Sequence, residues 1–390
     1  DLHLFIEISE KKRTSFSLLI RLMSLKKSKF NHKDKRFMRL ALNLASDRIG
    51  LTGENPSVGC VIVKNNEVIS IGQTGINGRP HAEFNAVKSC KKNLNGSKMF
   101  VSLEPCTHFG KTPPCSNIII NSKIKEVIFP LVDVDTRTTS KSFKIFKAKK
   151  IKVKLGLLKN DAKEIYKSYI YNRKNKLPFV TGKLAISKDN CIYSKKRKKI
   201  TNEYSNSITH LLRYKNDSIL ISNKTLNIDN PKLNCRIHGL SHYSPKRIIL
   251  DRNLSIKRKS YIFKTSTKKN TIIFYNKGPL KKINLLIKMG VKLIKLNTDK
   301  KNFFNLKLVL NKIYSLGCRN LLVEGGKSLT DSFLKTKLFN QFFLFKSPIK
   351  LGKNAKLNIS SQLNQLSFKY KKKSKLNAFT GKDIVYIYSK

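Results

Sequence analysis

Apolar and polar positions alternate along the first half of the chain in a way that predicts short, mixed elements. Between Asp34 and Ser46, apolar residues recur three and four positions apart, which predicts an amphipathic helix. Apolar runs bounded by turn residues predict strands at 58–63, 68–72, 99–103, 127–130 and 151–155. Further helices are expected at 81–89, from Pro113 onward and over 157–172. Strands that alternate with helices indicate an α/β architecture.

The same alternation continues in the second half, after Pro178. Strands are predicted near 179–186, 218–222, 247–250, 271–274, 292–295 and 320–323, and helices near 203–214, 280–289, 304–316 and 328–334. No Gly-x-Gly-x-x-Gly follows a strand, so the Rossmann dinucleotide fingerprint is absent. The basic segment 173–176 separates the two halves.

These patterns predict a division of the 390 residues into four parts. Residues 1–33 form an N-terminal extension, which we expect to be disordered, or not native before Met23. A first domain covers 34–155, a linker helix covers 156–177, and a second domain covers 178–390. At this length each domain can bury its own core.

Composition narrows the class of protein. Hydrophobic residues make up 40% of the chain, which supports globular folding. No run approaches the roughly 20 apolar residues that span a bilayer, so no membrane association is expected. Seven scattered cysteines do not resemble a disulfide framework. We therefore expect a reducing, cytoplasmic location.

The net charge of +58 allows two interpretations. Clustered cations neutralise phosphates, which would indicate a basic RNA-binding protein. However, lysine greatly outnumbers arginine and is spread over the whole length, as an A/T-rich coding sequence would produce. Arginine is the residue favoured for specific phosphate and base contacts. Biased composition is the preferred interpretation, and nucleic acid is not expected as a partner.

One constellation in the first half carries the parts of a zinc hydrolytic site. His81 and Glu83 lie at a predicted helix start, and Cys106 and Cys115 lie near strand-to-helix junctions, where a helix N-terminus stabilises thiolate. Three protein ligands leave a zinc coordination position open for water, and a nearby carboxylate can move protons. A structural zinc is the alternative, but such sites usually have four ligands. Cys60 and Cys90 are expected in the core.

The eight residues between the two cysteines make the motif more specific. The run from Pro105 to Cys115, with Asn55 to Val63 and His81-Ala82-Glu83 upstream, resembles the deaminase half of the bifunctional riboflavin-biosynthesis (RibD) family. The resemblance implies a cytidine-deaminase-like three-layer domain with zinc held by His81, Cys106 and Cys115. It also implies that Glu83 is the proton shuttle and that Asn55 helps to hold the substrate. The loop 131–137 departs from the family, because it keeps Asp133 but lacks the prolines.

The second half resembles the reductase half of the same family over 182–189, 222–236, 245–251 and 324–326. This implies a dihydrofolate-reductase-like α/β domain that uses NADPH. The implied cofactor residues are Ala185, Thr225, Asp229, Gly326, Lys327 and Ser328. The implied substrate residues are Arg213, Leu233, Arg236 and Glu324. Taken alone, the glycines at 325 and 326 fit an anion cradle at a helix start, or simply a tight turn.

Two departures weaken the match in the second half. Asn190 stands where the family has a glycine, and the run 195–199 is entirely basic where the family has a serine and an aromatic residue. The serine and aromatic residue expected to touch substrate and cofactor are therefore missing from that run.

The resemblance implies two consecutive reactions on a phosphoribosyl pyrimidine. A zinc-dependent deamination of 2,5-diamino-6-(5-phosphoribosylamino)pyrimidin-4(3H)-one is followed by an NADPH-dependent reduction of 5-amino-6-(5-phosphoribosylamino)uracil. The competing hypothesis is a basic RNA-binding protein or a tRNA-type deaminase. The long cysteine spacing and the attached α/β half both argue against it. The sequence leaves a homo-oligomer open.

Overall fold

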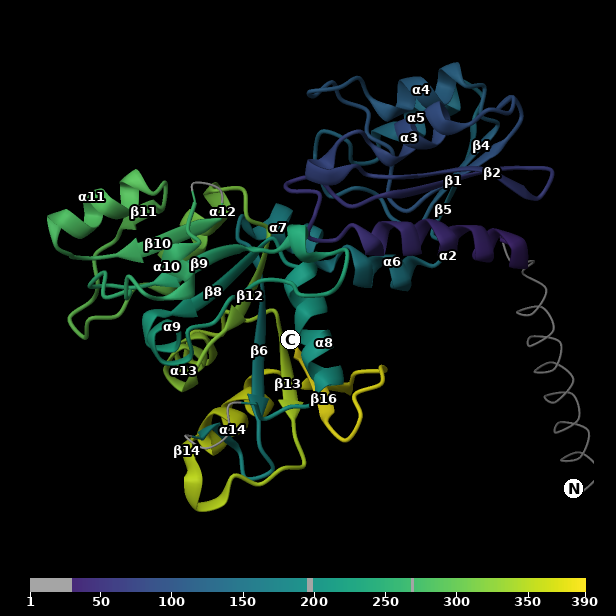
Figure 1. Ribbon diagram of the computed structural model, residues 1–390. Coiled ribbons are helices and arrows are strands. Elements are labelled where there is room, and N and C mark those ends of the chain that lie inside the picture. Colours follow the sequence, from purple (N-terminus) through teal and green to yellow (C-terminus); the bar gives the residue numbers. More distant parts are fainter. Residues whose placement is uncertain (1–29, 195–198, 268–269) are drawn as a thin grey trace, which may run out of the picture.

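The structure, a computed structural model, describes residues 30–194, 199–267 and 270–390 (Figure 1). The expected N-terminal extension before Met23 and most of the basic run 195–199 therefore lie outside the described residues. Two large sheets organise the described chain, with helices packed around each. Among these residues, no helix combines the length and the apolar character needed to cross a bilayer.

The first sheet has five strands in the order β2-β1-β3-β4-β5. β1 pairs antiparallel with β2 and β3, while β3, β4 and β5 run parallel to one another. The strands are β1 (Gly59–Lys64), β2 (Glu67–Gln73), β3 (Lys98–Val101), β4 (Glu126–Phe129) and β5 (Lys152–Leu155). The helices of this half are α2 (His32–Asp47), α3 (Ala82–Ser89), α4 (Cys115–Asn121) and α5 (Lys141–Ala148).

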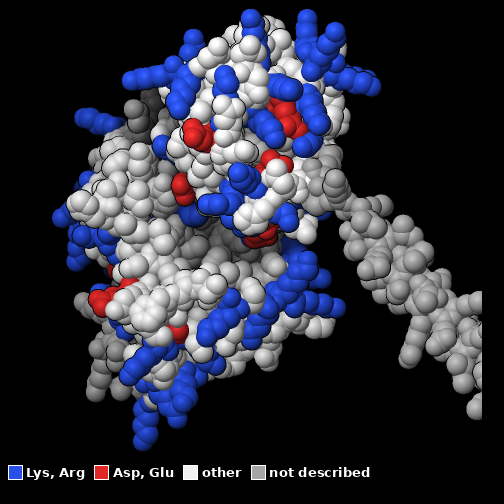
Figure 2. All heavy atoms as spheres, turned by 90° about the vertical axis from the view of Figure 1, so that its right-hand side faces the viewer, with Lys and Arg blue, Asp and Glu red and all other residues white. Residues whose placement is uncertain are grey.

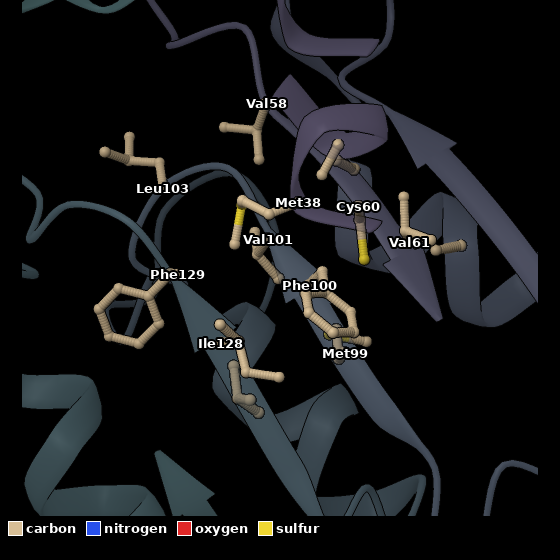
Figure 3. Close-up of a cluster of buried hydrophobic side chains, with 14 of the residues drawn as sticks. Met38, Val58, Cys60, Val61, Met99, Phe100, Val101, Leu103, Ile128 and Phe129 are labelled. Carbon is tan, nitrogen blue, oxygen red and sulfur yellow. The ribbon is translucent and has the colours of Figure 1, made fainter. Parts of the chain in front are cut away.

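Helix α2 shows why the first half folds as its pattern predicts. Asn31 caps the helix, because its side chain accepts a hydrogen bond from the Asp34 amide at 2.7 Å. Met38, Ala41 and Ala45 follow one face and are fully buried against the sheet. Figure 3 shows Met38 among the side chains of Cys60, Phe100 and their neighbours in this core. The cluster places Cys60 in the core, as expected, whereas Cys90 is half-buried and is not part of the cluster.

The segment between the sheets forms two helices, α6 (Lys159–Ile165) and α7 (Lys167–Asn175), where the sequence predicts one. They meet at Tyr166, which belongs to the first core and is 2% exposed. Its hydroxyl donates to the Ser57 carbonyl at 2.9 Å and lies 2.6 Å from the Ser102 hydroxyl. The segment therefore packs on the first half, and the predicted division of the chain stays a prediction.

The second sheet has nine strands in the order β11-β10-β9-β8-β12-β6-β13-β16-β15. Neighbours from β11 to β13 are parallel, and β16 and β15 complete the sheet antiparallel. The strands are β6 (Phe179–Ile186), β8 (Ser218–Ser222), β9 (Lys246–Leu250), β10 (Thr271–Tyr275), β11 (Lys292–Lys295), β12 (Asn320–Glu324), β13 (Gln341–Lys346), β15 (Lys372–Lys375) and β16 (Ile384–Ser389). A separate pair joins β7 (Cys191–Ser194) to β14 (Ala355–Asn358).

Helices flank the second sheet, and most of them were predicted. They are α8 (Glu203–Tyr214), α9 (Asn223–Asp229), α10 (Tyr261–Lys264), α11 (Leu280–Lys288), α12 (Leu306–Ser315), α13 (Lys327–Lys335) and α14 (Ser360–Lys369). Short 3-10 turns occupy 76–78, 241–243 and 352–354. The predicted strands and helices up to residue 334 are present, while α5, α9, α10, β7 and all elements from β13 onward were not predicted.

The two halves meet where the loop after α2 contacts the end of α8. Gly50 packs so tightly on Lys215 that a Cβ atom added to it would lie 2.6 Å from the Lys215 carbonyl carbon. The Tyr214 hydroxyl donates to the Asp47 carbonyl at 3.2 Å. Arg319, next to the start of β12, pairs with Glu54. The end of α2 and the loop 48–55 are therefore in direct contact with the second half.

Candidate active sites

One imidazole and two thiols converge in the first half. His81 caps the N-terminus of α3, Cys115 begins α4, and Cys106 lies in the loop after β3. His81 Nδ1 is 3.3 Å from Cys115 Sγ and 3.5 Å from Cys106 Sγ, and the three atoms all lie within 4.8 Å of one another. All seven cysteines lie in the described residues and are free thiols. One nitrogen and two sulfur donors at such separations fit a tetrahedral zinc ion with one open position.

The electrostatics of this cluster favour a thiolate. Hydrogen bonding from Cys115, and then from His81, outweighs burial and lowers the pKa of Cys106 to about 4. The Cys115 amide also donates to Cys106 Sγ at 3.2 Å, from the N-terminal end of α4. Thiolate is the form that binds metal. Cys106 is therefore close to its metal-binding form, while the hydrogen bond to Cys106 and burial raise the pKa of Cys115.

Glu83 lies beside the three donor atoms in the first turn of α3. Its side chain is 4% exposed. Burial, reinforced by the neighbouring Cys106, raises the pKa of Glu83 to about 7. A carboxyl group with a pKa close to the working pH can both accept and release a proton.

A cavity of about 740 Å³ opens over this cluster. Asn55 lies in its wall and donates to the Gly78 carbonyl at 2.9 Å. Gly78 has φ +89°, and a Cβ there would lie 2.8 Å from the Asn55 amide nitrogen, so only glycine fits beside Asn55. The cavity is lined mainly by polar and charged side chains, among them Arg79, His81, Glu83, Cys106, His108, Lys111, Asp133, Asp135, Arg137, Tyr169 and Arg173.

The loop that lacks the family prolines is held by hydrogen bonds instead. Glu104 is 3% exposed, and its carboxylate accepts from the amides of Asp133, Ser140 and Ser142 and from the Ser142 hydroxyl. Asp135 accepts from the side chain and the amide of Arg137, which lowers the pKa of Asp135. The departure in sequence therefore leaves a well-fixed loop along the cavity.

The second half forms a buried ion pair at its predicted substrate site. Arg213 of α8 makes two hydrogen bonds to Glu324 at the end of β12, at 2.7 and 2.8 Å. Burial alone would raise the pKa of Glu324, but the charge and hydrogen bonds of Arg213 hold it below its ordinary value. Arg236 is exposed, and its guanidinium is held by the side chain of Asn234 at 3.0 Å. The Asn234 carbonyl accepts from Arg213, so both arginines border one short segment.

Several predicted cofactor residues gather at neighbouring strand ends. β8 and β12 are parallel neighbours, so α9 and α13 begin at the same edge of the sheet. Gly326 caps α13, and a Cβ there would lie 3.5 Å from the Thr225 hydroxyl. Lys327 and Ser328 form the first turn of α13, a position suited to a phosphate group. Ala185 lies on β6, the other neighbour of β12.

Two further predicted residues lie differently. Leu233 is 2% exposed, and its side chain packs in a hydrophobic cluster with Ile219 and Ile249. Asp229 ends α9 and is exposed. In the described part of the chain, neither side chain forms a hydrogen bond with Arg213 or Glu324.

Sequence reasoning missed three side chains at these sites. Lys183 is the β6 partner of Glu324 in the sheet register, and burial lowers the pKa of its ammonium group. His210 is one turn before Arg213 and contacts the Asn234 carbonyl at 3.2 Å. Arg173 extends from α7 into the wall of the first cavity. Lys183 lies in the segment 182–189, whose resemblance to the reductase family was the available signal. His210 and Arg173 belong to no short motif.

Comparison with known proteins identifies the family of the chain. A family model described as the RibD C-terminal domain matches residues 178–380, and the cytidine and deoxycytidylate deaminase zinc-binding region matches 31–131. The riboflavin biosynthesis protein RibD of Aquifex aeolicus is 31% identical over 360 residues, covering 92% of this chain and 98% of that protein. The chain belongs to the RibD family.

Other members of the RibD family match more than nine tenths of the chain. RibD of Actinobacillus pleuropneumoniae is 32% identical and covers 91% of this chain and 95% of its own. A Thermotoga maritima structure, named a diaminohydroxyphosphoribosylaminopyrimidine deaminase/5-amino-6-(5-phosphoribosylamino)uracil reductase, has a TM-score of 0.77 at 28% identity and covers 92% and 99% of the two chains. Acinetobacter baumannii RibD, form 1, has a TM-score of 0.79 at 25% identity, with coverage of 92% and 98%. The predicted family and fold class are confirmed, with a deaminase-like domain followed by a RibD reductase domain.

Proposed function

We propose that this RibD-family enzyme of riboflavin biosynthesis performs its two reactions at the two sites described above. In the first half, 2,5-diamino-6-(5-phosphoribosylamino)pyrimidin-4(3H)-one loses an amino group as ammonia. In the second half, 5-amino-6-(5-phosphoribosylamino)uracil is reduced to the ribitylamino product. The observation that carries the assignment is the convergence of His81, Cys106 and Cys115 beside buried Glu83 in a cavity large enough for a phosphoribosyl pyrimidine.

His81 Nδ1 and the sulfur atoms of Cys106 and Cys115 would hold the zinc ion. When bound, zinc supplies a water whose pKa is lowered to about 7 and which can attack an amino-bearing ring carbon. The donor set fits this role because it is small and leaves room for a fourth ligand. A structural zinc would be expected to have a fourth protein ligand.

Glu83 would move the protons of the deamination. Its carboxylate takes a proton from the attacking water and delivers it to the departing amino group, so that nitrogen leaves as ammonia. The buried position of Glu83 beside the donor atoms and its pKa of about 7 both support this assignment. Asn55, fixed by its bond to the Gly78 carbonyl, would orient the pyrimidine in the cavity.

In the second half, Arg213, Arg236 and Glu324 would bind the phosphoribosyl substrate. Thr225, Gly326, Lys327 and Ser328 would bind the cofactor, with Ala185 and Asp229 as further predicted contacts and Leu233 shaping the substrate site through its backbone. NADPH, when bound, supplies the hydride that reduces the ribosyl carbon. The turn at Gly326 supports the assignment, because the first turn of α13 leaves amides free for a phosphate.

A coupled assay tests the whole proposal. Purified enzyme is given the diaminopyrimidine, and ammonia release and NADPH oxidation are recorded separately. Both signals are expected, with ammonia appearing without NADPH and NADPH oxidation requiring the deaminated product. Absence of ammonia from zinc-loaded enzyme would contradict the first assignment. Absence of NADPH oxidation with authentic deaminated substrate would contradict the second.

The enzyme acts on a small molecule. A cytoplasmic location stays a prediction. Figure 2 shows lysine and arginine spread over one face rather than gathered into a single stripe. On this face the distribution favours biased composition over a dedicated RNA surface, as does the spread of lysine along the whole sequence. A gel-shift with tRNA at physiological salt checks the point, and no specific shift is expected.

A further inference from the structure

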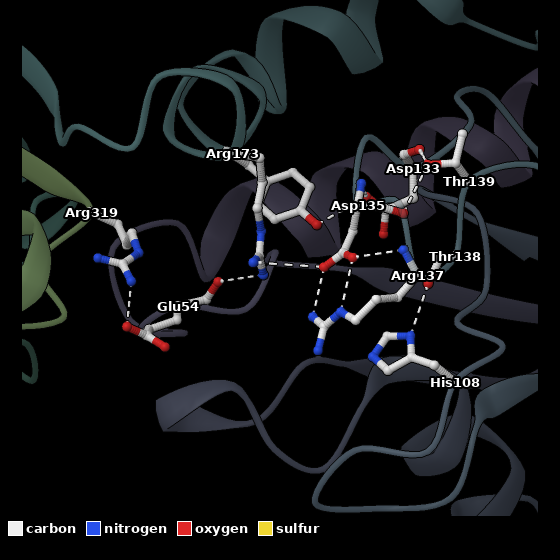
Figure 4. A network of polar contacts seen from close by, with 10 residues as sticks. Glu54, His108, Asp133, Asp135, Arg137, Thr138, Thr139, Arg173 and Arg319 are labelled. Carbon is white, nitrogen blue, oxygen red and sulfur yellow. Dashed lines mark hydrogen bonds and ion pairs between the residues drawn. The ribbon is translucent and has the colours of Figure 1, made fainter.

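Arg173 occupies an unusual place, because it comes from the helix between the two sheets and reaches the wall of the deaminase cavity. One guanidinium nitrogen donates to the Glu54 carbonyl at 3.3 Å, and another lies 3.6 Å from the Asp135 carboxylate. Figure 4 shows the guanidinium between these two partners. Glu54 precedes Asn55, and Asp135 belongs to the loop fixed by Glu104. One side chain therefore bridges two separate loops that line the same cavity.

The helix that carries Arg173 binds this loop at two points. Tyr169 and Arg173 are four residues apart on α7 and so lie on the same helix face. The Tyr169 hydroxyl donates to Asp133 at 2.9 Å, while Arg173 faces Asp135. The guanidinium also lies over the Tyr169 ring, 5.3 Å from its centroid. Two side chains one turn apart thus hold two carboxylates that are two residues apart.

The second sheet reaches the same bridge through Glu54. Arg319 binds the Glu54 carboxylate, and its own backbone amide is held by Asp217 at 2.7 Å. The Arg319 side chain is 12% exposed and the Glu54 side chain is 63% exposed, so solvent reaches this contact from the glutamate side. The contacts run from Arg319 through Glu54 and Arg173 to Asp135 and Arg137.

We propose that Arg173 is a positioning residue of the deaminase site, which sets the separation of the Asn55 loop and the 131–139 loop by bridging Glu54 and Asp135. The inference rests on the proposed deaminase function and adds a residue from outside the first sheet. Arginine suits the task because its planar group offers several donors in fixed directions, whereas lysine offers a compact point charge. Arg173 touches none of the reacting groups, so it acts on how the substrate is held.

The test compares Arg173→Met, Arg173→Lys and wild type in steady-state ammonia release. Misplacing a site by about 1 Å can cost about 100-fold, and loss of one bridge is expected to raise KM by about tenfold. The kcat is expected to stay within about threefold, because Glu83 and the three donor atoms are untouched. Arg173→Lys is expected to fall between the other two, since it keeps the charge but not the bridge.

Matched measurements separate positioning from general damage. Arg39→Ala removes an exposed ion pair to Asp161 in the same half and is expected to leave KM unchanged. Zinc content is expected to equal that of wild type in every variant. Glu54→Ala removes only the link to Arg319, and a KM increase of about threefold is expected from it. If Arg173→Met does not fold, Asp135→Asn removes the charge that faces Arg173 and carries the same expected KM increase. Arg137→Met is its control, because Asp135 also binds the Arg137 side chain.

Equal KM values for wild type and Arg173→Met, or for wild type and Asp135→Asn, would overturn the proposal. So would a loss confined to kcat with KM unchanged, since that would place Arg173 in the chemical step. Wild-type enzyme that contains zinc but releases no ammonia would instead overturn the deaminase assignment itself. The two failures are therefore distinguishable on the same preparations.

Discussion

The two proposed active sites of the chain are built in different ways. In the first half, three donor atoms and a carboxylate come from residues 81–115 and meet within a few ångströms. In the second half, Arg213 and Glu324 are separated by 111 residues and meet through a parallel sheet. The first site depends on a few side chains of distinctive chemistry. The second depends on strand ends, helix starts and one buried ion pair.

This difference decides how each site responds to change. A metal site loses its chemistry when one donor is removed, although the surrounding fold persists. A site made of a buried ion pair couples binding to stability, because breaking the pair leaves a buried charge without a partner. Substitutions in the two halves should therefore separate loss of reaction from loss of fold.

Removing a proposed metal donor is expected to separate loss of reaction from loss of fold most clearly. Cys106→Ser should reduce zinc content and lower ammonia release by about 1,000-fold or more, because water without the metal has a pKa near 15.7 rather than about 7. NADPH oxidation with the deaminated substrate should persist. Metal analysis and the two assays measure this, and prolonged chelation of wild type should reproduce it. Ammonia release by metal-free enzyme would contradict the metal-dependent assignment.

Glu83→Gln should remove the proton transfer alone. Zinc should stay bound, while kcat for ammonia release should fall by about 100-fold to 10,000-fold, the contribution of a positioned acid or base. The matched comparison is Cys106→Ser, which should lose both metal and activity. Retained ammonia release in Glu83→Gln would refute the role given to this carboxylate.

Arg213→Met tests the other half, where stability and reaction should fall together. Removing Arg213 takes away both hydrogen bonds to the buried Glu324 carboxylate, so the free energy of unfolding should fall by about 3 kcal/mol. NADPH oxidation should be lost while ammonia release continues. Denaturant unfolding and the two assays measure these effects. An unchanged unfolding midpoint would show that the pair is exposed to solvent in solution.

Gly50→Ala should disturb the contact between the halves. Gly50 has φ +87° and no room for a Cβ beside Lys215, so the variant should lose about 2 kcal/mol. Gly96→Ala is the control, because Gly96 has φ +76° but nothing within 4 Å of the added atom. Equal losses in thermal unfolding would mean that backbone strain alone accounts for both.

The smallest effect concerns pH and the cavity loop. Burial raises the pKa of Asp133 to about 6, so the folded state binds a proton more tightly than the unfolded state. The charged Asp133 carboxylate therefore lowers the free energy of unfolding most above pH 6, and this loss becomes smaller as pH decreases. Asp133→Asn should have a larger free energy of unfolding than wild type at pH 7.5. This difference should be smaller by about 1 kcal/mol at pH 5. A pH-independent difference in unfolding free energy would contradict the raised pKa.

The sequence predicts the first site better than the second for a physical reason. The first site contains rare residue types at fixed spacing, namely His81, Glu83, Cys106 and Cys115. Their order along the chain is therefore enough to identify them as candidate site residues. Leu233 stays a prediction at the substrate site, and the sequence does not reveal that its side chain packs in a hydrophobic cluster, because an apolar residue in a loop gives no chemical signal of its direction.

Long-range pairing limits what the pattern along the chain can show. The strands β13, β15 and β16 were not predicted, since their place depends on pairing with β6 and with each other. The sequence predicts one helix over 157–172, where the structure has α6 and α7 on either side of Tyr166, whose backbone has φ −89° and ψ 5°. Arg173 looked like part of a basic connector, and only the fold brings it between Glu54 and Asp135.

Some of the excess lysine lies on the outermost strands of the nine-stranded sheet, where its charge has a structural effect. Its two outermost strands, β11 and β15, carry Lys292, Lys295, Lys372, Lys373 and Lys375, all exposed. An outermost strand offers unpaired backbone groups on which another chain could add a strand, and lysine opposes such growth by charge repulsion. A compositional bias that serves neither reaction would thus help to keep crowded copies of the enzyme from aggregating edge to edge.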